Sequence, residues 1–101
     1  MSNDNRSNDR KLAQLCREAH RVLAQVLPGE VDDPILAGVT VIDVRPAPDA
    51  SRLAVGVALA PGDEVAVVLE RLGRLRGMLR SELAAALARK RTPEIVFEVV
   101  A

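Results

Sequence analysis

The segment VTVIDVRPAPDASRLAVGVALA, residues 39–60, decides the fold of this chain. Its first six residues alternate as in a strand with both faces partly covered, with Val41 and Asp43 on one face and Ile42 and Val44 on the other. The turn residues PDAS (48–51) follow the end of that strand. From Leu53 to Ala60, leucine and valine alternate with alanine and glycine, which predicts a second strand with a small-residue face. Together the two strands predict an antiparallel hairpin.

Amphipathic helices are predicted on both sides of this hairpin. Before it, apolar residues recur at steps of three and four, which predicts a helix from near Asp9 to a stop before Pro28. After it, Asp63 is the expected N-cap of a second helix, whose apolar stripe runs to Leu75. A third apolar stripe consists of leucines at four-residue spacing: Leu79, Leu83 and Leu87.

Two glycines separate the second helix from the third. A glycine inside a helix costs about 1 kcal/mol relative to alanine, so Gly77, preceded by Gly73, predicts a kink instead of one long helix. The segment EIVFEVV (94–100) alternates again and predicts a last strand. The element order α-β-β-α-kink-α-β predicts an α+β fold, with the helices packed on one face of a three-stranded sheet.

Length and composition indicate one small intracellular domain. Residues 1–8 are polar after the initiator Met, so we expect a disordered leader followed by a single domain over 9–101. Neither a signal peptide nor an apolar run long enough for a membrane span is recognisable, which favours a cytoplasmic protein. The single cysteine, Cys16, lies on the predicted apolar face of the first helix and suits a reducing compartment.

The charges are strongly segregated although the formal net charge is zero. Residues 30–64 contain seven acidic residues and two arginines, whereas residues 71–91 contain seven basic residues and one glutamate. Phe97 is the only aromatic residue, so bases have no platform on which to stack. Any RNA binding must therefore use charge and shape, and the basic segment is the candidate for it.

The sequence offers no set of residues for catalysis or metal binding. His20 is alone, so neither a metal site nor a catalytic triad can be assembled around it. Asp32 and Asp33 are adjacent carboxylates before a proline and are interpreted as loop or capping acids. The glycines form neither a GxGxxG nor a GxxxxGK pattern. We therefore expect a protein that is not an enzyme and needs no cofactor.

Four segments, taken in order, resemble the ribosome-binding factor A family. They are DDP (32–34) leading into VTVIDV, PDAS (48–51), GMLRSELA (77–84) and RKRTPEIVFEV (89–99). The resemblance implies a type II KH-like fold, in which a helix-kink-helix written Ala-x-Gly replaces the glycine-rich loop of ordinary KH domains. The aligned residues here are Leu75, Arg76 and Gly77, so the glycine is present and the alanine is not.

The resemblance also implies a function. Members of the family associate with the free small (30S) ribosomal subunit or its precursor and assist late maturation of 16S rRNA, including its 5′ end. They matter most in the cold, leave before translation begins and catalyse nothing. We accordingly expect a monomer whose partners are the 30S subunit, its precursor and 16S rRNA.

The expected RNA-binding residues are those of the basic segment: Arg71, Arg74, Arg76, Gly77, Arg80, Arg89, Lys90 and Arg91. Glu70 and Arg74 also have the spacing of an ion pair within a helix. The basic residues near the amino end are interleaved with acids, and an ordinary exposed helix face is favoured for them: Arg6, Arg10, Lys11, Arg17 and Arg21. The alternative function is a KH-like or ferredoxin-like module that dimerises through apolar helix faces without binding RNA.

Overall fold

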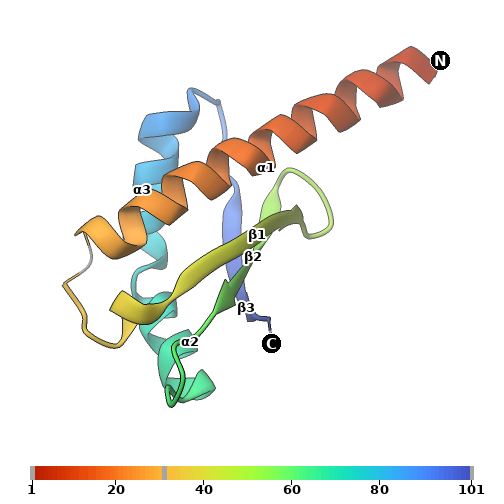
Figure 1. Cartoon of the computed structure of the whole chain (residues 1–101). Coiled ribbons are helices and arrows are strands. Elements are labelled where there is room, and N and C mark those ends of the chain that lie inside the picture. The colour runs from red at the N-terminus through yellow and green to blue at the C-terminus, as the bar shows by residue number, and fades with distance from the viewer. Residues whose placement is uncertain (1, 31, 101) are drawn as a thin grey trace.

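The computed structural model describes residues 2–30 and 32–100. Its elements are, in order, α1 (Ser2–Glu30), the short 3-10 turn η1 (Leu36–Gly38), β1 (Thr40–Pro46), β2 (Arg52–Ala58), α2 (Val65–Arg74), α3 (Arg76–Leu87) and β3 (Glu94–Val99). Figure 1 shows the long α1 running alongside the sheet and α3 crossing α1. This arrangement confirms the predicted α+β class and element order.

The sheet is mixed, and β2 is its central strand. β1 pairs with β2 in the antiparallel sense, which confirms the predicted hairpin, and β3 pairs with β2 in the parallel sense. In the hairpin turn, the Asp49 carboxylate accepts hydrogen bonds from the backbone N–H of Ser51 (2.9 Å) and from its hydroxyl (2.6 Å). These bonds, which lower the pKa of Asp49, fix the turn that the PDAS segment predicts.

A β-bulge interrupts the regular alternation of β1. The register shifts between Val41 and Asp43, and as a result both Val41 and Val44 are buried while Ile42 is 47% exposed. The sequence had placed Val41 and Val44 on opposite faces, which is wrong because the bulge adds one residue to β1 between them.

The hydrophobic core lies between the helices and one face of the sheet. β2 contributes Leu53, Val55 and Val57, all fully buried. α1 packs against β1 and α3, whereas α2 packs against β3. The predicted stripes supply most of the core: Leu15, Ala19, Val22, Leu23, Val26 and Leu27 of α1, Val68 and Leu72 of α2, and Leu79, Leu83 and Leu87 of α3. Cys16 is buried with them, and this burial raises the pKa of its thiol.

The opposite face of the sheet carries charged side chains over small ones. Arg45 of β1 forms ion pairs with Asp43 on the same strand (3.4 Å) and with Glu98 of β3. Beneath them, Asp43 lies opposite Gly56 in the register, and Arg45 lies opposite Ala54. The small residues of β2 therefore allow this ion-pair network to cross the central strand.

Three helix ends differ from the sequence expectation. α1 begins at Ser2 and not near Asp9, because residues 2–8 contain neither glycine nor proline to stop it, and Figure 1 shows this end extending beyond the sheet. The division into a disordered leader at 1–8 and a domain at 9–101 stays a prediction. α1 also continues through Pro28 to Glu30. The N-cap of α2 is Glu64 instead of Asp63, and it makes no side-chain capping hydrogen bond.

The break between α2 and α3 is at Leu75 and not at Gly77. The Leu75 backbone has φ −89° and ψ −1°, and its N–H bonds to the Leu72 carbonyl at 3.1 Å, as in a tightened last turn. Gly77 lies inside the first turn of α3, where a Cβ atom would meet nothing within 4 Å. The expectation that Gly77 forms the kink is wrong, since a local turn at a leucine breaks the helix without needing a glycine.

Candidate nucleic-acid interface

The predicted basic residues lie in two groups at the two ends of α3. Arg71 and Arg74 are in the last turn of α2, and Arg76, Gly77 and Arg80 are in the first turns of α3. The second group follows α3 in the loop before β3: Arg89, Lys90 and Arg91. Because an α-helix rises about 1.5 Å per residue, roughly 18 Å of α3 separates the two ends.

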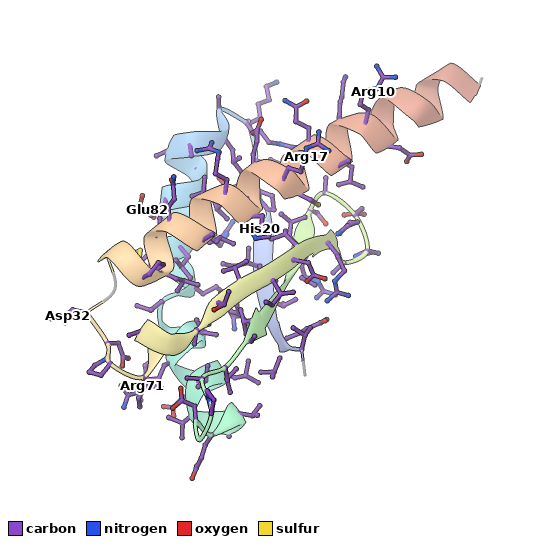
Figure 2. The ribbon with its side chains drawn as sticks, in the orientation of Figure 1. Arg10, Arg17, His20, Asp32, Arg71 and Glu82 are labelled. Atoms are coloured by element: carbon purple, nitrogen blue, oxygen red, sulfur yellow. The ribbon has the colours of Figure 1, made fainter. Side chains whose placement is uncertain are left out.

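Arg71 is held by an acid from the loop after α1. Its Nη1 donates to Asp33 Oδ2 at 2.9 Å, and Figure 2 shows Arg71 beside the loop that carries Asp32. The other oxygen of Asp33 accepts from the backbone N–H of Ile35 at 3.0 Å. The Arg71 hydrogen bond, followed by the Ile35 N–H, lowers the pKa of Asp33. Asp33 is thus a loop acid, one of the two roles that the sequence suggests, and its pair with Arg71 ties this loop to α2.

Arg74 and Arg80 also have partners within the protein. Arg74 pairs with Glu70, four residues earlier in α2, as its spacing predicts. Arg80 donates to the backbone oxygens of Thr92 (3.2 Å) and Pro93 (3.3 Å). Arg80 therefore anchors the loop before β3 to α3. No pattern in the sequence around Arg80 indicates this role.

Four of the predicted cations remain available to a ligand. They are exposed and have no hydrogen bond or ion pair within residues 2–30 and 32–100: Arg76, Arg89, Lys90 and Arg91. Gly77 is exposed beside Arg76, and the space next to its Cα is open. The structure therefore separates the predicted site into free cations and cations that stabilise the fold.

A hollow beside the first helix contains His20 and Cys16 but no second histidine or cysteine. It has a volume of ≈ 480 Å³, lies between α1 and β1, and includes His20 and Cys16 among its lining residues. Over the part of the chain that the structure describes, no group of three or more histidines, cysteines and acids could hold a metal ion.

No described helix has the length and apolarity that crossing a membrane demands.

The sequence missed residues that become neighbours only through the fold. Lys11 of α1 lines one hollow with Arg89, although the two are far apart in the chain. Ser51 of the hairpin turn lines a second hollow with Arg89 and Arg91. No local pattern could have found these pairs, because they depend on how α1 and the hairpin turn lie against the loop before β3.

Comparison with known proteins relates this fold to one family. The family model of ribosome-binding factor A matches residues 11–99. Ribosome-binding factor A from Halorhodospira halophila is 33% identical over 86 residues, which are 83% of this chain and 68% of that protein. The protein from Phenylobacterium zucineum is 39% identical over 70 residues, which are 67% of this chain and 48% of that protein, so this chain spans about half the length of that relative.

Solved structures agree with the sequence match. The crystal structure of ribosome-binding factor A from Thermus thermophilus has a TM-score of 0.79 and 31% identity, covering 87% of this chain and 93% of that one. A homology model of the Thermus thermophilus protein, fitted into a cryo-EM map of its complex with 30S, has a TM-score of 0.67 and 32% identity over 86% of this chain and 88% of that one. This chain therefore belongs to the ribosome-binding factor A family.

Proposed function

We propose that this protein is a ribosome-assembly factor that binds the free 30S subunit or its precursor by contacting 16S rRNA. The observation that carries the proposal is the set of exposed cations without partners in the described residues: Arg76, Arg89, Lys90 and Arg91. Exposed guanidinium and ammonium groups are the usual ligands of RNA phosphates. The relative from Thermus thermophilus that was fitted into a map of a 30S complex supports the choice of the small subunit.

The other predicted residues have supporting parts in this proposal. Arg80 donates to uncharged carbonyl groups and so adds positive potential near the bound RNA. Arg71 and Arg74, whose charges are offset by Asp33 and Glu70, stabilise α2 beside it. Gly77 has no side chain and lies beside Arg76, so the RNA backbone can approach α3 closely there. The whole predicted set would thus act together, with Arg76 and the residues after α3 making the direct contacts.

The proposed biological role is assistance in late maturation of 16S rRNA, including its 5′ end. The protein would act in the cytoplasm as a monomer without a cofactor, by occupying its site on the maturing particle and not by catalysing a reaction. This role is the one that the family resemblance implies, and the match of residues 11–99 to the family model supports it.

Sedimentation of the protein with purified small-subunit particles tests the proposal. Each phosphate that is neutralised contributes a slope of about −0.7 to −0.9 to log affinity against log salt. We expect the protein to sediment with the particles at low salt and to be released at high salt. If it forms a salt-insensitive dimer on a sizing column and never sediments with the particles, it is the dimerising module instead.

A further inference from the structure

Arg89 forms a common wall of two hollows on the surface. The first, ≈ 280 Å³ in volume, lies between α1 and the end of α3 and is lined by Lys11, Gln14, Leu15, Glu18, Leu87 and Arg89. The second, ≈ 220 Å³, lies between the hairpin turn and the loop before β3 and is lined by Ala50, Ser51, Arg89, Arg91, Thr92 and Pro93. Residues from the beginning, middle and end of the chain therefore meet around one arginine.

The groups that line these hollows suit anions. Lys11, Arg89 and Arg91 are exposed and form no ion pair or hydrogen bond with any described residue. The second hollow has no carboxylate in its lining, and Thr92 adds a hydroxyl group to its two arginines, whereas the Ser51 hydroxyl already donates to Asp49 at 2.6 Å. In the first hollow one carboxylate, that of Glu18, accepts a hydrogen bond from Gln14 Nε2 at 3.2 Å. The lining of the first hollow therefore holds two cations and one acid, and the lining of the second holds two cations and no acid, with Asp49 behind Ser51.

The loop that carries Arg89 has a defined conformation. Ala88 ends α3 in the left-handed region, with φ 40° and ψ 48°, which costs a residue with a side chain about 1–2 kcal/mol. On the far side of the loop, Arg80 is bonded to the carbonyl oxygens of Thr92 and Pro93. Arg89 makes no hydrogen bond to the carbonyl groups that end α3, so capping that helix does not explain its position. The left-handed residue and the Arg80 anchor thus hold Arg89 between the two hollows.

We propose that the two hollows hold neighbouring phosphate groups of one RNA strand, and that Arg89 contacts both. Lys11 contacts the phosphate in the first hollow, and Arg91 with Thr92 contacts the phosphate in the second. The proposal rests on the proposed rRNA binding and adds a path: the strand crosses the loop before β3, from α1 towards the hairpin turn. The ligand is the phosphodiester backbone, because the single aromatic residue of the chain provides no platform for bases.

Single alanine substitutions in the full chain test this path, with controls matched in sequence and exposure. The test variants are Lys11→Ala, Arg89→Ala and Arg91→Ala. The controls are Arg10→Ala and Arg17→Ala, because Arg10 and Arg17 are exposed on the same helix as Lys11 and line neither hollow. Affinity for a single-stranded oligoribonucleotide is measured at several salt concentrations, after circular dichroism has confirmed that each variant is folded.

The expected result is a graded change in the salt dependence. Lys11→Ala and Arg91→Ala should each reduce the steepness of log affinity against log salt by about 0.7, the value for one phosphate contact with a single strand. Arg89→Ala should reduce it by more than either, and each control by less than half as much as Lys11→Ala. If either control equals Lys11→Ala, or if Lys11→Ala has no effect, a diffuse basic surface binds the RNA and the two-hollow path is wrong.

Sedimentation with small-subunit particles separates this inference from the proposed function. If the particles bind the parent and all five variants lose affinity equally, the path is wrong and the proposed function stands. If the oligoribonucleotide shows the graded pattern while the parent fails to sediment with the particles, the path is supported and the proposed function is wrong.

Discussion

The packing around position 56, in the central strand of the sheet, requires a glycine. A Cβ atom there would come 3.3 Å from Asp43 Cγ and 3.3 Å from Val100 Cγ1, and would overlap Asp43 Oδ1. That oxygen is buried and has no hydrogen-bond partner among the described residues, so the carboxylate lies directly over the glycine. The position therefore excludes side chains through close approach and not through an unusual backbone conformation.

Gly56→Ala should consequently destabilise the protein. Asp43 would have to rotate away, which disturbs its ion pair with Arg45. We expect a loss of roughly 1–3 kcal/mol in the free energy of unfolding, measured by urea titration. Repeating the substitution in an Asp43→Ala background provides the control, because the smaller residue leaves room for the new methyl group. Equal losses in the two backgrounds would show that Asp43 is not the obstacle.

Gly77 should behave in the opposite way, since it lies inside α3 with open space beside it. Gly77→Ala should raise the free energy of unfolding by up to about 1 kcal/mol, because alanine is the better helix former. If RNA approaches the helix closely here, the same variant should bind small-subunit particles less tightly. If the variant is more stable and binds the particles as tightly as the parent, Gly77 is not an RNA-binding residue. If the variant is less stable than the parent, Gly77 is part of the kink after all.

At the scale of elements, the Asp33–Arg71 pair joins the loop after α1 to α2. The folded state lowers the pKa of Asp33, so the pair stabilises the protein above the pKa of an unfolded aspartate, about 3.9. This contribution decreases as the pH falls through 3.9 and is lost below the lower pKa of the folded state. Acid should therefore weaken the ion pair that joins the loop after α1 to α2.

Asp33→Asn tests this link. We expect the variant to be less stable than the parent at pH 7, and the difference between them to shrink towards pH 3, as followed by urea unfolding at each pH. Asp49 also has a lowered pKa, so the variant should keep some acid sensitivity. Asp32→Asn is the matched control, because Asp32 is exposed and adjacent. If the two variants have the same pH profile, the Arg71 contact contributes nothing measurable.

The sequence predicted the elements better than their junctions. The stripes of α1, α2 and α3 and the hairpin follow from hydrophobic periodicity, because each element must bury one face. The bulge in β1 and the break at Leu75 depend on backbone geometry that no residue type marked. The division of the basic residues into unpaired and paired ones also depends on the tertiary structure. Arg71 and Arg80 find their partners only when the loops before η1 and before β3 lie against the helices, so the sequence alone could not show that they also have roles within the protein.

At the scale of the whole molecule, affinity for small-subunit particles should depend more on where positive charge lies than on how much of it there is. Changing Arg89, Lys90 and Arg91 together to Glu should lower affinity for small-subunit particles by on the order of tenfold or more at low salt, because attraction for phosphates becomes repulsion. The three residues are exposed, so each change should alter the free energy of unfolding by only about 0.5 kcal/mol. Sedimentation of the folded variant with the particles gives the comparison.

An equal change of charge elsewhere provides the control. Arg10, Arg17 and Arg21 are exposed on α1, where Figure 2 shows Arg10 and Arg17, and line neither hollow beside Arg89. Changing these three to Glu should reduce affinity much less. If this control loses binding while the Arg89–Arg91 variant keeps it, the RNA lies along α1 and the placement at the end of α3 is wrong.

The parallel pairing of β3 with β2 also determines the order in which the molecule can fold. The hairpin closes over a few residues, whereas β3 can join β2 only after the whole crossover through α2 and α3 has been made. Until then the free edge of β2, with Leu53, Val55 and Val57 beside it, can pair with the same edge of another nascent chain. Aggregation during synthesis should therefore compete with the arrival of the last strand, and rapid expression should favour the aggregate.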